Sequence, residues 1–261
     1  MRRRSFLVLA GACSVCSCAG AVHRLPQVTG DSVAMARSEV QSAGAPRRHA
    51  VTDEEGIAML RSAVRRIRPS ASEVCREMNV GVCTWTFRAS SDRSMNAASG
   101  ANGLIIVNRG IVEYAANEEE MAMVIAHEIG HQSANHVATA QRNQAVGALI
   151  GALLGTAVMA SGGYGGADAM QTGADVGAAV GRISYSKEQE READYLAALI
   201  LYRSGVDLDR ARGFLVTMAR ASGRRETGML DTHPAGPERI AGWDRAVAEI
   251  RASHGRLPQR A

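Results

Sequence analysis

The sequence has few aromatic residues: three Phe, two Trp and five Tyr make up 4% of its 261 residues. A sheet sandwich with a core of large rings is therefore disfavoured, and the abundance of Ala and Gly favours closely packed helices. Apolar residues make up 46% and charged residues 21%, which are ordinary values for a globular protein. The length suffices for one sizeable domain.

The chain also lacks a basic stripe. Arg2, Arg3 and Arg4 supply three charges of the net +4, and the first 22 residues hold no acidic residue. Without this segment the net charge is only +1. Nothing remains that would neutralise a row of phosphates, so we expect no nucleic-acid partner.

The first 21 residues are typical of an export signal, because the three arginines precede a short apolar stretch. The order Arg-Arg-Ser-Phe-Leu at residues 3–7 also resembles a twin-arginine signal, although a general secretory signal stays open. We expect a flexible tether at residues 22–50, a catalytic domain at residues 51–254 and a tail at residues 255–261. The mature protein is predicted to lie outside the cytoplasm.

Cysteine is scarce and unevenly placed. Three of the five cysteines follow the apolar stretch, and Cys18 fits an acylation site best, so we expect a lipid anchor there. Cys13 fits less well, and plain cleavage after Ala21 is the alternative. Cys75 and Cys83 are the remaining pair, and either a local disulfide or two buried thiols would explain them. Two cysteines at this spacing do not make a zinc site.

Hydrophobic periodicity predicts an α+β fold that is mostly helical, with a small β-sheet beside the central helix. Helices are expected from Thr52 to Pro69, which should end the first one, and over residues 117–135, 188–202, 208–221 and from 237 onward. Strands are expected at residues 82–87 and 104–107. Glycines recur every four residues in segment 145–181, which favours a tightly packed helical hairpin over an insertion that touches lipid.

His127-Glu128-Ile129-Gly130-His131 carries the main chemical signal. Two histidines at i and i+4 lie on one helical face, so both can bind one zinc ion. Glu128 would take a proton from the zinc-bound water, which becomes a nucleophile near neutral pH. The pattern follows an N-cap at Asn117, which strengthens the prediction of a catalytic helix.

A catalytic zinc ion needs a third protein ligand and one open position. No further histidine follows at the short spacing that some zinc peptidases use, so a carboxylate from a later helix is the better candidate. Glu190 and Asp194 share one helical face, and Asp194 would lie behind the zinc ion and accept a hydrogen bond from a ligand histidine. For two of Glu188, Glu190 and Glu192 we expect a solvated acidic face.

The chain resembles the zinc metallopeptidase family of HtpX, the CAAX prenyl proteases, the mitochondrial OMA-type proteases and the BepA-like proteins, and fits its soluble exported branch best. The resemblance covers about residues 52 to 245. It is carried by Asn96-Ala97, by His127-Glu128-Ile129-Gly130-His131, by Glu190-Arg191-Glu192-Ala193-Asp194, and by Thr232-His233-Pro234 with Arg239.

The resemblance implies a gluzincin-type domain that binds one Zn²⁺ through His127, His131 and Glu190. It implies that His233 and Arg239 serve the tetrahedral intermediate or the substrate near the metal, where a donor would stabilise the developing oxyanion. Alternatively, His233 is a fourth ligand that displaces water and holds the enzyme inactive.

The leading hypothesis is an endopeptidase that cuts unfolded or damaged proteins of the bacterial envelope, attached to the outer membrane by its lipid. Substrate would lie along the edge strand near residues 96–107. One alternative is a chaperone or assembly factor for outer-membrane proteins with a latent zinc site. Another is an esterase or amidase with the same zinc site, for which no small-molecule pocket is evident.

Overall fold

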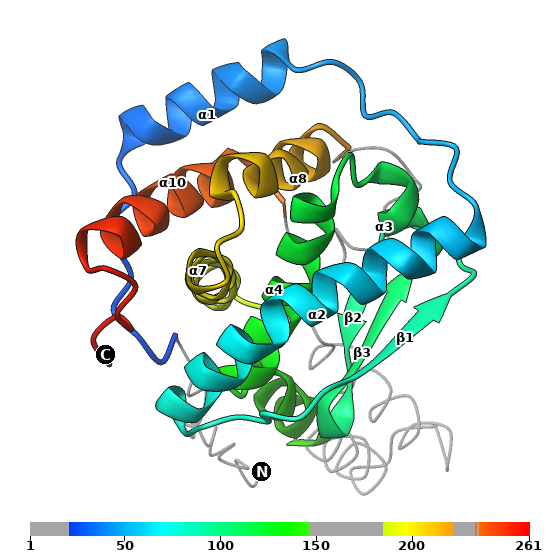
Figure 1. Cartoon of the computed structure of the whole chain (residues 1–261). Coiled ribbons are helices and arrows are strands. Elements are labelled where there is room, and N and C mark those ends of the chain that lie inside the picture. Colours follow the sequence, from blue (N-terminus) through cyan, green and yellow to red (C-terminus); the bar gives the residue numbers. More distant parts are fainter. Residues whose placement is uncertain (1–20, 147–184, 222–232, 234) are drawn as a thin grey trace, which may run out of the picture.

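In the computed structural model, the described residues are 21–146, 185–221, 233 and 235–261. Cys18 and nearly all of the export signal lie outside them, as does the glycine-repeat segment from residue 147 onward. The described part is mostly helical with one small sheet, so the predicted fold class is confirmed (Figure 1).

The fold is built around α4 (Glu118–Ser133), whose residues from Glu120 to Ser133 are all buried. The side chain of Asn117 accepts a hydrogen bond from the N–H of Glu120 and caps the helix, as predicted. α4 packs against α2 (Asp53–Met78), α7 (Lys187–Arg203) and α8 (Leu208–Ala221), and α10 (Pro237–Ala252) packs against α7. A helix buried on all sides suits the centre of a domain, and the residues Met121–Ala126 before the histidine motif are accordingly all apolar.

A three-stranded sheet lies beside α4, in the strand order β1-β3-β2. β1 (Thr86–Ser90) runs parallel to β3 (Leu104–Asn108), and β2 (Ala97–Ser99) runs antiparallel to β3. The short helices η1 (Ala101–Gly103) and α3 (Arg109–Tyr114) flank β3. β2 contacts α4, so an edge strand of the sheet lies next to the histidine motif.

The strand expected at residues 82–87 begins later, because β1 spans Thr86–Ser90. The N–H of Val82 donates to the main-chain oxygen of Gln132 at the end of α4, 3.2 Å away. Gly81 approaches the same helix so closely that an added Cβ would lie 2.0 Å from that oxygen. These contacts hold residues 81–82 against α4, so pairing with the sheet begins only at Thr86.

The prediction that Pro69 ends the first long helix is wrong, because α2 continues to Met78. A proline inside a helix removes one hydrogen bond and crowds the preceding turn. The apolar stripe resumes beyond it, and Ile67 and Ala71 on either side are both fully buried. Packing of this stripe outweighs the local penalty. The helix ends at Asn79, whose φ of 52° is left-handed.

The two chain ends also differ from the sequence-based expectation of a tether and a tail. Residues 30–42 form helix α1 (Gly30–Ser42), which contacts α10 and α8. Arg212 of α8 binds Glu39 of α1 and Asp244 of α10, each at 2.6 Å. Residues 22–24 pair with residues 259–261 at the opposite end of the chain. Long-range ion pairs and main-chain pairing leave little periodicity, so the sequence did not reveal them.

In the described part of the chain, no helix combines the length and the apolar character that crossing a membrane requires.

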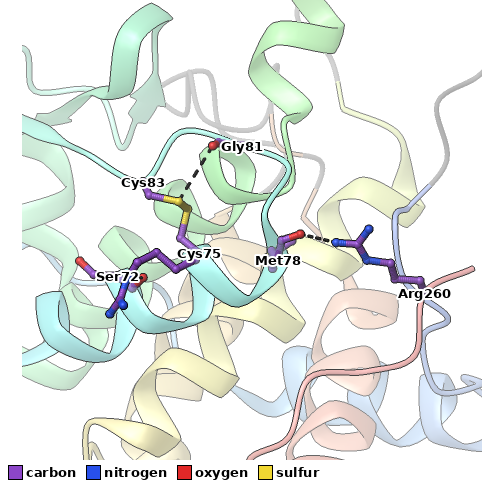
Figure 2. The surroundings of a disulfide bond; sticks show 7 residues. Ser72, Cys75, Met78, Gly81, Cys83 and Arg260 are labelled. Atoms are coloured by element: carbon purple, nitrogen blue, oxygen red, sulfur yellow. Dashed lines mark hydrogen bonds between the residues drawn. A yellow bond between two sulfur atoms is a disulfide. The ribbon is translucent and has the colours of Figure 1, made fainter.

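Cys75 and Cys83 form a disulfide, which decides between the two possibilities that the sequence left open (Figure 2). Their Cα atoms lie 5.5 Å apart. Figure 2 shows the bond joining the last turns of α2 to the loop before β1, with Arg260 donating to the main-chain oxygen of Met78 nearby. The disulfide thus fixes the loop that leads from α2 into the sheet.

We predict that the double variant Cys75→Ser/Cys83→Ser unfolds with a free energy lower by about 2.5 kcal/mol, because the eight-residue loop is no longer closed in the unfolded chain. Urea denaturation followed by circular dichroism measures this change. A reductant should lower the midpoint of the wild type and leave that of the variant unchanged. Equal midpoints for the two proteins would contradict the prediction.

Candidate metal centre

The two motif histidines project from successive turns of α4 and are buried. The Nε2 atoms of His127 and His131 lie 3.1 Å apart. Gly130 sits between them, where an added Cβ would lie 2.9 Å from the main-chain oxygen of Ala193 in α7. Glycine therefore lets α4 and α7 approach closely, which brings the acidic residues of α7 to the histidines.

Glu190 extends from the first turn of α7 to both histidines. Its Oε1 is 3.4 Å from His131 Nε2, and its Oε2 is 3.5 Å from His127 Nε2. His233 reaches the same point from a different segment, with Nδ1 2.9 Å from Glu190 Oε1 and 3.3 Å from His127 Nε2. Each of the four residues offers one ligand atom, and these atoms all lie within 4.8 Å of one another.

This cluster fits a divalent cation. A neutral imidazole has one N–H and one lone pair, and the Nδ1 of His127 lies 2.9 Å from Asp194 Oδ1, where its proton belongs. The lone pair on His127 Nε2 then faces two further imidazole nitrogens and a carboxylate, so several metal-binding atoms lie around one point. Three nitrogens and one carboxylate oxygen form a donor set that zinc accepts.

The charge states of His131 and Glu190 suit metal binding. Burial lowers the pKa of His131 well below its ordinary value, which keeps the imidazole neutral. Burial alone would raise the pKa of Glu190, but the neighbouring His233 and Arg239 outweigh this effect and hold it well below the usual range. A neutral imidazole and an ionised carboxylate are the forms that bind a metal ion. Burial and the charge of Arg239 would lower the pKa of His127, but its hydrogen bonds with Asp194 and Glu190 outweigh them and raise it to about 9, so a metal ion has to displace a proton there.

Asp194 and Arg239 support the ligands from behind. Arg239 donates through Nε and Nη2 to the two Asp194 oxygens, at 2.8 and 2.7 Å, and its Nη1 lies 2.9 Å from Glu190 Oε2. Burial would raise the pKa of Asp194, but Arg239 and the hydrogen bond with His127 hold it below its ordinary value. Arg239 thus orients two carboxylates, and its expected contact with a tetrahedral intermediate stays a prediction.

Glu128 points into the same buried space. Its Oε2 lies 2.8 Å from the hydroxyl of Ser99 on the edge strand β2. Its Oε1 has no hydrogen-bond partner within the described residues and lies 3.5 Å from His233 Nε2. A buried carboxylate oxygen without a partner is costly, which indicates that it serves a group that binds there.

Sequence reasoning missed several residues around the cluster. Ser99 holds Glu128, and Tyr185 stacks on His131 with ring centroids 3.8 Å apart. Neither belongs to a local pattern that a single sequence reveals. His136 contacts His131, and its position five residues later was a signal that could have been used. Glu192 is wholly buried, so the expected solvated face holds for Glu188 alone.

Residues 62–246 match Peptidase family M48, and the chain belongs to this family. The fold and the buried cluster agree with that assignment. The chain is 34% identical over 157 residues to the Beta-barrel assembly-enhancing protease of Escherichia coli strain K12, which covers 56% of this chain and 31% of that protein.

Two other relatives share part of the chain. Mitochondrial metalloendopeptidase OMA1 of Arabidopsis thaliana is 29% identical over 156 residues, covering 60% of this chain and 30% of that protein. Metalloprotease YcaL of Escherichia coli strain K12 is 28% identical over 162 residues, covering 62% of this chain and 61% of that protein. For the Beta-barrel assembly-enhancing proteases, by contrast, the matched part of the chain spans about a third of their length.

We predict that Glu190→Gln removes zinc whereas Glu188→Gln retains it. Both residues lie in the first turns of α7, but only Glu190 is buried in the cluster and Glu188 is exposed. The loss of affinity should exceed the roughly 10- to 100-fold cost of losing an outer partner of a metal ligand. Metal content after dialysis against a chelator is the measurement. Equal zinc content in the two variants would exclude Glu190 as a ligand.

Proposed function

We propose that this chain is a zinc-dependent metalloendopeptidase of the bacterial cell envelope that hydrolyses peptide bonds of unfolded or damaged proteins. The observation that carries the proposal is the buried Glu128 Oε1, which lacks a hydrogen-bond partner among the described residues and lies beside the three-histidine and glutamate cluster. His127, His131 and Glu190 would hold the zinc ion. When bound, zinc supplies Lewis acidity that activates water and polarises a carbonyl.

The chain's own groups then have separable tasks. Glu128 accepts the proton of the attacking water at Oε1, while the Ser99 hydroxyl holds its other oxygen. Asp194 and Arg239 fix the orientation of His127 and Glu190. Once protonated, Glu128 can return the proton to the leaving amine.

We expect an extended substrate to lie along the edge of β2, beside this site. Among the described residues β2 pairs with β3 alone, so we propose that its other edge offers main-chain groups to a further strand. Ser99 at the end of β2 contacts Glu128, so a peptide added to this edge passes the base. Main-chain pairing makes little use of side chains, which suits a broad range of unfolded proteins.

The proposed location rests on the N-terminal sequence. Its arginines, apolar stretch and Cys18 favour export and lipid attachment at the outer membrane, and the name of the Escherichia coli relative concerns β-barrel assembly. If mass spectrometry shows that the mature protein begins with an unmodified Val22, lipid attachment is excluded.

A latent state is favoured by the position of His233. With its Nδ1 in the cluster, four protein ligands surround one point, and a closed shell of this kind is typical of zinc that does not catalyse. We propose that the described conformation is latched by His233 and that this residue leaves the cluster when substrate binds. A permanently closed site would suit the second candidate function, a chaperone or assembly factor for outer-membrane proteins.

We predict that Glu128→Gln binds zinc like the wild type but cleaves casein roughly 10²- to 10⁴-fold more slowly, because general-base catalysis is lost. A chelator should abolish cleavage by the wild type, and added zinc should restore it. Full activity of Glu128→Gln would disprove the mechanism. Client protection retained by this variant, with no cleavage by the wild type, would favour the chaperone.

We predict that His233→Ala cleaves casein faster than the wild type, by roughly 10-fold for each 1.4 kcal/mol of latch energy removed. The measurement is the initial rate at saturating zinc, with zinc content determined in parallel. A slower rate with full zinc occupancy would show that His233 acts on the substrate or the intermediate instead.

A further inference from the structure

A second line of buried polar groups begins at His131 and leads away from the cluster. The Nε2 of His131 faces the metal ligands, whereas its Nδ1 lies 3.1 Å from the Nδ1 of His136. The Nε2 of His136 lies 3.0 Å from Glu192 Oε2. All three side chains are at most 2% exposed, so water does not supply alternative partners.

If both imidazoles are neutral, only one arrangement of protons gives each pair, His131–His136 and His136–Glu192, one donor and one acceptor. A metal ion on His131 Nε2 leaves the proton of that ring on Nδ1, which donates to His136 Nδ1. His136 then carries its own proton on Nε2 and donates it to Glu192. The reverse tautomer of His136 would set a lone pair against the carboxylate. Glu192 therefore fixes the tautomer of His136, which in turn orients His131.

Glu192 is held from its other side by the beginning of the described chain. The N–H groups of Val22 and His23 donate to Oε2 and Oε1 at 2.8 and 2.9 Å, and the Nδ1 of His23 lies 2.6 Å from Oε1. With His136, four hydrogen bonds reach one carboxylate. A buried carboxylate is tolerated only when it is well paired. The hydrogen bonds from residues 22–23 therefore stabilise Glu192 in this buried position.

The two motif histidines are thus supported by different parts of the chain. His127 rests on Asp194 and Arg239, which belong to α7 and α10. His131 rests on His136 and Glu192, and through Glu192 on a segment 169 residues away in the sequence. That segment is itself held by the C-terminus, since the N–H of Ala261 donates to the main-chain oxygen of Val22 at 2.9 Å.

We propose that His136 and Glu192 are positioning residues for the metal ligand His131, and that His23 belongs to the metal centre because it holds Glu192. The inference rests on the zinc site of the proposed function. It goes beyond that site by making metal affinity depend on the N-terminal segment, which contributes no ligand.

The test is zinc affinity of the full chain, measured by chelator competition, together with the visible absorption of the cobalt-loaded protein. His136→Ala should bind zinc roughly 10- to 100-fold more weakly and shift the cobalt bands, because His131 loses its orientation. His136→Gln should recover part of the affinity, since its amide can both accept and donate. Unchanged affinity and an unchanged spectrum in His136→Ala would overturn the positioning role.

A matched control is Glu113→Gln. Glu113 is also a buried carboxylate, 4% exposed, but it binds Arg48, Arg93 and Arg109 near α3 and not the cluster. This variant should lose thermal stability and keep the zinc affinity and the cobalt spectrum of the wild type. If it weakens zinc binding as much as His136→Ala does, the effect is general destabilisation and the inference fails.

The role of His23 is tested by a double-mutant cycle. His23→Ala should weaken zinc binding less than His136→Ala does, and His23→Asn, which keeps a donor, should weaken it less still. In the Glu192→Ala background, His23→Ala should have no further effect, because the connecting side chain is gone. Wild-type affinity in His23→Ala, or additive losses in the double variant, would overturn the coupling.

These outcomes separate the inference from the proposed function. A wild type that binds zinc and cleaves casein through Glu128, combined with indifferent His136 and His23 variants, refutes only the inference. A wild type that binds no zinc refutes both.

Discussion

The close packing of α4 against α7 is the constraint on which the rest of the site depends. At Gly130 the backbones approach so closely that any side chain would collide with Ala193. This contact places the first turns of α7 opposite the two histidines of α4, so Glu190 reaches both Nε2 atoms. α4 alone offers two candidate metal ligands, and the approach of α7 brings a third candidate to them.

The same contact creates an electrostatic problem that the surrounding fold solves. Glu190, Glu192 and Asp194 are three carboxylates within five residues, and each is at most 1% exposed. Buried charges are tolerated only with partners. Arg239 of α10 serves Glu190 and Asp194, while His136 and His23 serve Glu192. α10 and the N-terminal segment thus supply the partners that the buried carboxylates of α7 require.

The sequence allowed the residues of the cluster to be predicted much better than the residues that support them, and the role of the cluster residues as zinc ligands stays a prediction. The spacing of His127 and His131 is local and has a direct geometric meaning, and the pairing of Glu190 with Asp194 follows from helical periodicity and the family resemblance. The family and the fold class are confirmed. The role of Glu192 was missed, because its partners lie 56 and 169 residues away and no periodicity connects them.

Errors in the fold have the same origin. Pro69 and the N-terminal segment were judged from local propensity, but buried neighbours and long-range ion pairs decided both. Tertiary contacts override weak local preferences most readily where a segment packs on several elements at once. α1 is such a segment, since it contacts both α8 and α10.

The family match covers the cluster but not all of the residues that support it. The matched range, residues 62–246, contains all four side chains of the cluster and also His136, Glu192 and Arg239. Val22 and His23 lie before it, and residues 259–261, which pair with residues 22–24, lie after it. The part shared with the family thus carries a buried acid whose remaining partners come from outside that part. Because an unpaired Glu192 would destabilise the very helix that presents Glu190, we infer that the chain ends act on the candidate metal centre through the hydrogen bonds donated to Glu192, without supplying a ligand.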